Sequence, residues 1–249
     1  MKGVVLAGGL GTRLYPLTRA TNKHLLPVYD RCMVQYPLET LVRAGIREVM
    51  LVTGGPHAGD FLAVLGDGRE LGLSRLQYAF QEGEGGIAAA LRLCEDFADG
   101  ERILVVLGDN VTNADLSADV RSFVRGARVF VKPVDNPSEY GVPEFDDSTP
   151  PRILRIIEKP KLPPSHLAVT GLYMYDAHVF DYIRALKPSG RGELEITDVN
   201  NRYLDEDALS WSELDGVWLD AGESKDALLR ANLEVARWHE SSALTKEPA

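Results

Sequence analysis

Continuous aliphatic runs alternate with helical patterns through the first half of the chain. The runs occupy residues 4–7, 49–52 and 103–107, and each has the length expected of a strand that is buried on both faces. Between the first two runs, apolar residues recur at helical spacing: Val34, Leu38, Leu41, Val42 and Ile46. Ala44-Gly45 provides a helix stop, and a second helix is expected over about residues 87–97. This alternation is typical of βα units and predicts an α/β fold with a Rossmann-like, mostly parallel mixed sheet covered by helices.

The pattern changes after Asp109. Residues 128–131 and 153–157 have strand character, and the proline-rich, acidic stretch 133–151 between them predicts loops and a small β-rich insertion. Helical spacing then returns twice, in Ile196, Val199 and Tyr203, and in Leu228, Ala231, Val235 and Trp238. Residues 241–249 are expected to be a frayed tail. Because we find no internal repeat and no long linker, we expect a single domain over residues 1–249.

Composition narrows the choice of ligands. The chain of 249 residues has 27 Lys and Arg against 37 Asp and Glu, which gives a net charge of −10. This excess of acid counts against a nucleic-acid or anionic-membrane surface, so any anionic ligand must meet locally placed cations. Cys32 and Cys94 form no CxxC pair, and the apolar run at the start is too short for a secretory signal. A cytoplasmic protein is therefore expected.

Glycines follow the first predicted strand directly, in Gly8-Gly9-Leu10-Gly11-Thr12-Arg13. Bare backbone N–H groups at such a strand exit can turn toward an anion. A dinucleotide fingerprint fails because Leu14 stands where a third small residue is needed, and a Walker A motif fails because Gly-Lys-Ser/Thr is absent. A tight turn with a surface arginine remains the alternative, although the guanidinium of Arg13 suits phosphate oxygens. Lys23 lies ten residues later and could point into the same site or simply be solvated.

Two aspartates end apolar runs. Asp109 follows residues 103–107, and Asp220 follows Val217-Trp218-Leu219. The carboxyl ends of strands in open α/β sheets are where ligands and metals bind, and one or two carboxylates suit Mg²⁺, which leaves its other positions to water and phosphate. A turn or helix cap is the alternative for each aspartate. Residues 158–160 are most simply a charged surface turn, and residues 192–198 an acidic first helical turn.

Taken in order, eight segments resemble the sugar nucleotidyltransferases, and within them the thymidylyl-transferring group. The segments are residues 6–18, 23–30, 107–110, 140–142, 158–160, 169–173, 192–198 and 218–222. The resemblance covers nearly the whole chain, which is similar to the short form of the family because it ends soon after the helix around Trp238. It implies a bacterial enzyme with a nucleotide-binding core over about residues 1–110, a sugar-phosphate-binding part over about 111–222, and a C-terminal helix and tail over 223–249.

The resemblance also implies roles for individual residues. The nucleotide would be bound by Leu6, Gly8, Gly9, Gly11, Thr12, Arg13, Gln81, Gly86 and Asp109. The sugar phosphate would be bound by Asn110, Tyr140, Gly141, Glu158, Lys159, Val169 and Tyr173. Arg13, Lys23 and Lys159 would be the catalytic cations, and Asp109 with Asp220 would hold Mg²⁺.

The reaction implied is transfer of a nucleotidyl group from dTTP to α-D-glucose 1-phosphate, giving dTDP-glucose and pyrophosphate. No general base is required, because a phosphate monoester loses its second proton near pH ~6. Thymine and uracil differ by one methyl group, worth about 1–3 kcal/mol, so UTP stays an alternative to dTTP, as does cytidylyl transfer to a related sugar 1-phosphate. A non-catalytic nucleotide-sugar-binding regulatory protein is the alternative from another class, and a homo-oligomer is left open.

Overall fold

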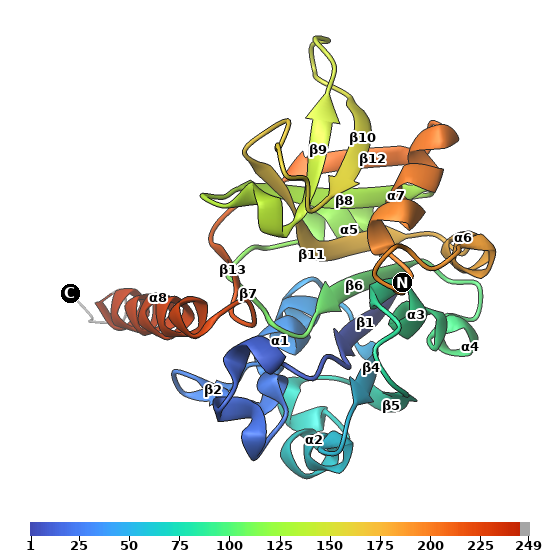
Figure 1. Ribbon diagram of the computed structural model, residues 1–249. Coiled ribbons are helices and arrows are strands. Elements are labelled where there is room, and N and C mark those ends of the chain that lie inside the picture. Colours follow the sequence, from blue (N-terminus) through green and yellow to red (C-terminus); the bar gives the residue numbers. More distant parts are fainter. Residues whose placement is uncertain (245–249) are drawn as a thin grey trace.

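A seven-stranded mixed sheet lies at the centre of the chain (Figure 1). The computed structural model describes residues 1–244. From edge to edge the strands are β12 (Leu209–Glu213), β8 (Ala127–Pro133), β11 (Leu167–Tyr175), β6 (Ile103–Leu107), β1 (Lys2–Ala7), β4 (Glu48–Gly54) and β5 (Arg75–Gln81). Neighbouring strands are parallel except that β11 runs antiparallel between β6 and β8. The predicted mostly parallel mixed sheet is confirmed.

Helices cover both faces of this sheet. They are α1 (Gln35–Arg43), α2 (Ala58–Leu65), α3 (Ile87–Arg92), α4 (Glu95–Ala98), α5 (Ser117–Ser122), α6 (Val179–Ala185), α7 (Ile196–Asp205) and α8 (Lys225–Leu244). Short 3₁₀ helices are η1 (Thr12–Leu14), η2 (Leu17–Arg19), η3 (Lys23–Leu25), η4 (Arg69–Leu71) and η5 (Pro137–Glu139). The core cluster on one face includes residues of α3, α4, α6 and α7, and the cluster on the other includes residues of α1 and α2.

The continuous aliphatic runs follow from this two-sided burial. In β1, Val4 and Leu6 belong to the core cluster on one face, whereas Val5 and Ala7 belong to the cluster on the other. Side chains alternate between the faces of a strand, so a strand covered on both faces needs apolar residues at every position. Burying each of the valine and leucine side chains contributes roughly 1.5–3 kcal/mol.

Three small antiparallel pairs complete the fold. β9 (Gly141–Phe145) pairs with β10 (Ile153–Glu158) in a hairpin that projects from the main sheet in Figure 1. This hairpin is the β-rich insertion predicted from residues 133–151. β7 (Asn110–Thr112) pairs with β13 (Trp218–Asp220), and β2 (Pro27–Val28) pairs with β3 (Arg31–Cys32). The β7–β13 pair connects the end of β6 with the start of the C-terminal region.

Two predictions about helices were wrong in detail. The single helix expected over residues 87–97 is divided into α3 and α4, because the N–H groups of Leu93 and Cys94 bond three residues back, to Ala90 and Leu91. Such tightened bonds end an α-helix. The prediction of a frayed tail over residues 241–249 placed the end of the last helix too early, since α8 continues to Leu244. Residues 245–249 lie outside the described residues.

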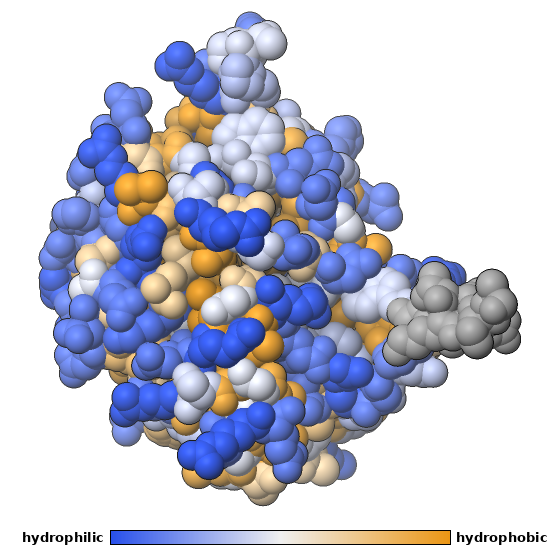
Figure 2. All heavy atoms as spheres, turned by 180° about the vertical axis from the view of Figure 1, so that it is seen from behind, coloured by the Kyte–Doolittle hydropathy of each residue, from blue (hydrophilic) through white to orange (hydrophobic). Residues whose placement is uncertain are grey.

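The C-terminal helix α8 packs its apolar side against the N-terminal region. Leu228, Ala231 and Val235 share a core cluster with Leu14 and Leu26, which confirms the helical face read from the sequence. On the face turned away in Figure 1, most of the surface is hydrophilic, with hydrophobic groups between (Figure 2). No helix within residues 1–244 is both long and apolar enough to cross a membrane.

Candidate active site

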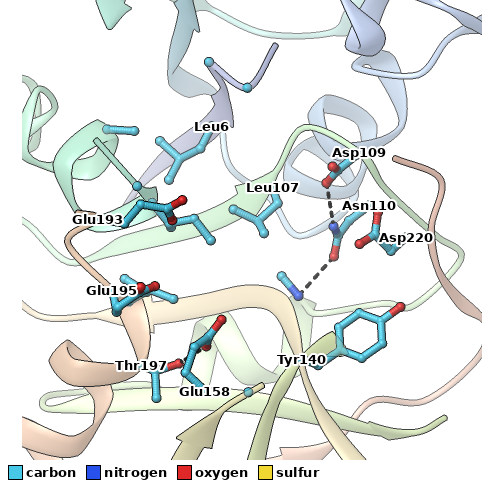
Figure 3. A pocket seen from close by; sticks show the side chains of 18 of the residues that line it. Leu6, Leu107, Asp109, Asn110, Tyr140, Glu158, Glu193, Glu195, Thr197 and Asp220 are labelled. Atoms are coloured by element: carbon cyan, nitrogen blue, oxygen red, sulfur yellow. Dashed lines mark hydrogen bonds between the residues drawn. The ribbon is translucent and has the colours of Figure 1, made fainter. Parts of the chain in front are cut away.

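A cavity of about 480 Å³ opens at the carboxyl ends of β1, β5 and β6 and is bordered on its other side by β9, β10, β11 and α7 (Figure 3). The four parallel strands β1, β4, β5 and β6 end at this edge, as expected for a ligand site in an open α/β sheet. The predicted site residues that line the cavity are Leu6, Gly8, Gly9, Thr12, Arg13, Lys23, Gln81, Gly86, Asp109, Asn110, Tyr140, Gly141, Glu158, Lys159, Val169, Tyr173 and Asp220. Gly11 is the member of the predicted set that does not line it.

The glycine loop is shaped around Lys23. Gly11 has φ +70°, and a Cβ there would lie 2.6 Å from the Cβ of Lys23. A Cβ on Gly9 would lie 3.5 Å from Lys23 Cε. Gly11 therefore acts indirectly: its left-handed backbone and missing side chain let the stem of Lys23 cross the loop. The loop is further held by a hydrogen bond from the Thr18 hydroxyl to the Gly11 carbonyl at 3.0 Å.

Gln81 closes the cavity next to this loop. It ends β5, and its Oε1 would lie 2.3 Å from a Cβ on Gly8, so a side chain at position 8 would displace it. Its amide nitrogen donates to the Gly86 carbonyl at 3.4 Å. The Gln81 carboxamide thus lies between two glycine-rich segments, where it offers a donor and an acceptor to a ligand edge.

A short ion pair, largely shielded from solvent, lies just after the end of β6. Lys23 Nζ donates to Asp109 Oδ2 at 2.6 Å, and the two side chains are 11% and 12% exposed. Burial opposes ionisation of Asp109, but the positive charge of Lys23 holds the pKa of this carboxyl well below its usual range. Gly222 lies against the pair, because a Cβ there would be 2.4 Å from Asp109 Oδ2 and 2.9 Å from Lys23 Nζ.

Asp220 reaches the same place through the β7–β13 ladder. In the antiparallel register Asp220 lies opposite Asn110, and the Ala221 N–H donates to the Asp109 carbonyl at 2.9 Å. Figure 3 shows Asp109, Asn110 and Asp220 on the same side of the cavity. Burial and the neighbouring negative charge of Asp109 raise the pKa of Asp220 to about 7. Asp109 and Asp220 thus both line the cavity, and the metal site expected of this pair stays a prediction.

Asn110 uses its carboxamide to orient this group. Its nitrogen donates to Asp109 Oδ1 at 3.1 Å, while its oxygen accepts from the Gly171 N–H at 3.1 Å and from Trp218 Nε1 at 2.6 Å. These bonds join the turn after β6 to the middle of β11 and the start of β13. The contact between Asn110 and a sugar phosphate stays a prediction, and the geometry adds a positioning role for Asp109.

The two aspartates are suited to share a divalent cation. Each offers carboxylate oxygens to the same side of the cavity, and the raised pKa of Asp220 arises partly from charge repulsion that a cation would relieve. Within residues 1–244, no cluster of three or more His, Cys, Asp or Glu side chains is arranged to hold a metal. A cation at Asp109 and Asp220 would therefore take its remaining oxygens from phosphate and water, as Mg²⁺ does.

Carboxylates and one guanidinium form the opposite side of the cavity. Thr197 Oγ1 donates to Glu158 Oε2 at 2.6 Å, and Arg191 Nη2 donates to Glu158 Oε1 at 3.2 Å and to Glu195 Oε2 at 2.8 Å. These bonds fix Glu158 at the end of β10. The loop that carries Arg191 is itself joined to the base side: the Leu194 N–H donates to the Gly85 carbonyl, and the Ala88 N–H donates to the Leu194 carbonyl.

Lys159 is held in an unusual backbone conformation. Its φ is +44°, and its N–H donates to the Tyr140 carbonyl at 3.0 Å. Within the described chain, neither the ammonium of Lys159 nor the guanidinium of Arg13 has a hydrogen-bond or ion-pair partner, and both side chains line the cavity. These two cations are therefore available to an anionic ligand. The turn at Lys159 aims one of them from the end of the β9–β10 hairpin.

Tyr140 and Tyr173 differ in how they meet the cavity. The Tyr140 hydroxyl donates to Glu223 Oε2 at 3.0 Å, and its ring packs edge-on against Trp218 with centroids 5.6 Å apart. Burial, together with the charges of Asp220 and Glu223, raises the pKa of Tyr140 far above its usual range. Tyr173 is 4% exposed, and burial with the charge of Glu158 raises its pKa above its usual range. Both phenols stay protonated at neutral pH.

Sequence reasoning missed several residues of this cavity. Arg191 directly precedes residues 192–198, which the sequence assigned to an acidic first helical turn. The helix α7 begins at Ile196, so Glu193 and Glu195 lie in the loop before it. The prediction for residues 192–198 was therefore wrong for 192–195, whereas residues 196–198 do begin α7, with Asp198 in its first turn. His24 is 2% exposed, with Nδ1 2.8 Å from Asn22 Oδ1, and burial and the charge of Lys23 lower its pKa to about 3. The Asn22-Lys23-His24 spacing alone gave no signal for this neutral buried imidazole.

Comparisons with known proteins place this cavity in a family. The nucleotidyl transferase family matches residues 2–237. The chain belongs to the nucleotidyl transferase family. A glucose-1-phosphate thymidylyltransferase from Actinoplanes sp. is 47% identical over 236 residues, which is 92% of this chain and 76% of the relative. One from Mycolicibacterium smegmatis is 45% identical over 237 residues, which is 93% of this chain and 81% of the relative.

Solved structures of other family members agree with the fold. A Bacillus anthracis protein described as a glucose-1-phosphate thymidylyltransferase, in complex with a sucrose, is 47% identical and superposes with a TM-score of 0.88 over 94% of both chains. A UDP-glucose pyrophosphorylase complexed with UDP-glucose gives a TM-score of 0.81 over 95% of this chain and 98% of that one, at 22% identity. The second likeness concerns the fold alone. The nucleotidyltransferase fold expected from the sequence is confirmed.

The backbone at Lys159 yields a first prediction. Lys159→Ala and Lys159→Gly both remove the ammonium, but glycine alone adopts φ +44° without strain. We expect Lys159→Gly to be more stable than Lys159→Ala by about 1 kcal/mol, measured by urea denaturation, while both variants use sugar 1-phosphate equally poorly. Equal stability of the two variants would contradict the strain, and unimpaired sugar-phosphate use would contradict the role of the cation.

Asp220 yields a second prediction. Its pKa is about 7 in the folded protein against 3.8 for an ordinary aspartate, so the folded state binds its proton more tightly. The stability that this proton contributes is full below pH ~4 and is lost as the pH rises through ~7. We expect the free energy of unfolding of the metal-free wild type, relative to Asp220→Asn, to fall between about pH 4 and about pH 7 in urea titrations and to level off above that range. A difference that does not vary with pH would exclude the repulsion between the aspartates.

Proposed function

We propose that this chain transfers the thymidylyl group of dTTP to α-D-glucose 1-phosphate, producing dTDP-glucose and pyrophosphate. The observation that carries the proposal is the distribution of charge in a single cavity. Lys23, Asp109 and Asp220 lie at the strand ends, with Arg13 beside them, and Lys159 lies across the cavity at the end of the hairpin. Two phosphorylated substrates can then meet between two sets of cations. The names of the relatives that are 43–47% identical to this chain support the same reaction.

At the strand ends the proposal assigns the triphosphate. The glycine loop offers backbone N–H groups at the exit of β1, and the unpartnered guanidinium of Arg13 would bind the departing pyrophosphate with its fork of donors. Lys23 would contact the reacting phosphates while it keeps its bond to Asp109. Because Lys23 is held by a carboxylate on one side and by the glycine loop on the other, its charge is fixed before the nucleotide arrives.

In the reaction, a phosphate oxygen of glucose 1-phosphate attacks the α-phosphorus of dTTP. The new oxygen–phosphorus bond forms as the bond from that phosphorus to the oxygen bridging the α and β phosphates breaks, and pyrophosphate leaves. The attacking oxygen is already deprotonated at neutral pH, so no side chain has to remove a proton. Catalysis then consists of alignment and charge neutralisation, and Lys159 would supply both for the sugar phosphate.

The proposal assigns Mg²⁺ to Asp109 and Asp220. When bound, the ion would neutralise phosphate charge and favour the ionised form of Asp220. Asp109 lies in the short turn between β6 and β7, and Asp220 is the last residue of β13. The Asn110 carboxamide bonds both Asp109 and Trp218, so it holds this turn against β13. The pair is thus arranged without needing the nucleotide.

A direct assay tests the proposal. Purified protein is incubated with glucose 1-phosphate, Mg²⁺ and dTTP, UTP or CTP in turn, and pyrophosphate release is measured. Turnover with dTTP supports the proposed reaction. Turnover with UTP or CTP alone would replace thymidylyl by uridylyl or cytidylyl transfer, and binding of a nucleotide sugar with no turnover of any pair would indicate a binding protein.

The third prediction concerns the two aspartates. Asp109→Asn and Asp220→Asn should fold and yet lose Mg²⁺-dependent turnover by ~10²–10³-fold, because each removes a preorganised charge. Asp135→Asn is the matched control, since Asp135 is exposed and outside the cavity. Its turnover should equal that of the wild type. Wild-type rates in either aspartate variant of the cavity would refute the metal assignment.

The fourth prediction concerns the base. Thymine and uracil offer the same hydrogen-bonding edge to Gln81 and differ by one methyl group, so the ratio of kcat/KM for dTTP over UTP should lie between about 10 and about 200. Gln81→Glu, which replaces the donating amide, should lower kcat/KM for both triphosphates together. A much larger natural preference would mean that a polar contact, rather than the methyl group, separates the two bases.

A further inference from the structure

Helix α7 carries two neighbouring asparagines in opposite surroundings. Asn201 uses both ends of its carboxamide on the backbone of β10: its oxygen accepts from the Ile156 N–H at 2.9 Å, and its nitrogen donates to the Ile156 carbonyl at 2.9 Å. This residue ties the helix to the hairpin. Asn200 belongs instead to the inner face of the helix and lines the cavity, as do Ile196 and Thr197.

The carboxamide oxygen of Asn200 is hydrogen-bonded within the protein, whereas its amide nitrogen has no partner among the described residues. The residue is 1% exposed, and its oxygen accepts a hydrogen bond from the Tyr175 hydroxyl at 2.6 Å. Within residues 1–244 this is the one hydrogen bond of the Asn200 side chain, yet no fully buried side-chain nitrogen or oxygen in this range is left without a partner. The amide nitrogen must therefore be reached by solvent, and because Asn200 lines the cavity, it is reached from there.

The orientation of Asn200 is set by a stack of aromatic rings. Tyr175 is fully buried and lies between Tyr173 and Tyr203, with ring centroids 5.9 Å and 5.7 Å away and interplanar angles of 12° and 21°. This packing leaves the Tyr175 hydroxyl little freedom, so it fixes the carboxamide oxygen of Asn200. The N–H groups at the other end are then held toward the cavity as a preformed donor.

The chemistry of this side of the cavity shows what such a donor is for. Glu158, Glu193 and Glu195 supply acceptors, which bind the O–H groups of a sugar. Each sugar hydroxyl also has lone pairs that need a donor, and the nearby Arg191 guanidinium is engaged with Glu158 and Glu195. The Asn200 amide is a buried, uncharged donor that matches a hydroxyl oxygen.

We propose that Asn200 is a specificity-determining residue whose amide nitrogen donates to one hydroxyl oxygen of the hexose in a hexose 1-phosphate. The inference rests on the proposed function and adds a requirement that the sugar carry one particular hydroxyl group. A sugar that lacks this hydroxyl leaves the buried amide unpaired, and an unpaired buried donor disfavours binding by roughly 10- to 100-fold. Asn200 therefore selects among hexose 1-phosphates without contacting the reacting phosphates.

The test compares sugars and variants together. Wild type, Asn200→Asp and Asn200→Ala are each assayed with glucose 1-phosphate and with its 2-, 3-, 4- and 6-deoxy analogues. We expect both variants to raise KM for glucose 1-phosphate by roughly 10- to 100-fold, with KM for dTTP unchanged. For one deoxy analogue, the KM of the variants and the KM of the wild type should be equal, because that sugar lacks the hydroxyl oxygen to which the Asn200 amide donates. Asn200→Asp keeps the acceptor for the Tyr175 hydroxyl, and Asn200→Ala adds no charge. If one of the two variants fails to fold, the other still tests the loss of the amide donor.

Asn201→Ala is the matched control on the same helix. It should lower the unfolding temperature through the lost contacts with Ile156, while the order of preference among the five sugars stays as in the wild type. Calorimetric binding of the five hexose 1-phosphates gives the same comparison without turnover, so absence of activity would defeat the proposed reaction and leave this measurement intact. The inference is overturned if no analogue closes the gap, if KM for dTTP rises equally, or if Asn201→Ala changes the order of preference.

Discussion

One ion pair, between the ammonium of Lys23 and the carboxylate of Asp109, lies where three segments of the chain meet at the strand-end side of the cavity. Lys23 comes from a short 3₁₀ helix near the start of the chain, and Asp109 follows the central strand β6. Gly11 must lack a side chain to let the lysine stem pass, and Gly222 must lack one to let the C-terminal segment approach the pair. Asp220 then lies next to both. Three segments far apart in the sequence are thus placed by a single contact of 2.6 Å.

The electrostatic logic of the site follows from this pair. A buried ion pair is costly to desolvate and is weak evidence for stability, so its retention in an acidic protein with a net charge of −10 needs another reason. Two anionic substrates must be brought together, and a fixed positive charge does this without reorganisation during the reaction. Lys23 is fixed by Asp109, whereas Arg13 and Lys159 have no hydrogen-bond or ion-pair partner in the described chain and are available to ligands.

Much of this arrangement follows from the sequence, and the remainder depends on tertiary contacts. The continuous runs of β1, β4 and β6 predicted the sheet, because strands buried on both faces leave no polar positions. Strand-terminal positions predicted that Asp109 and Asp220 would meet. Arg191 and Asn200 could not be found in this way, since one lies in a loop and the other follows a helical pattern in which an inward asparagine looks like an ordinary polar position. The start of α7 was also placed too early, because its preceding acidic residues bond Arg191 and Ser189 instead of capping the helix.

Hydrogen bonds join the two sides of the cavity and so set its width. At one end of the cavity, the backbone of Leu194 is hydrogen-bonded to Gly85 and Ala88, so the loop that carries Arg191 is attached to the loop beside Gln81. At the other, the Tyr140 hydroxyl binds Glu223, three residues after Asp220. A shift of the β9–β10 hairpin would therefore move Asp220 through the Tyr140–Glu223 bond. A shift of the loop beside Gln81 would move Glu158 through Leu194 and Arg191. Alignment of a sugar phosphate with a nucleotide then depends on these two connections as much as on the groups that touch either ligand.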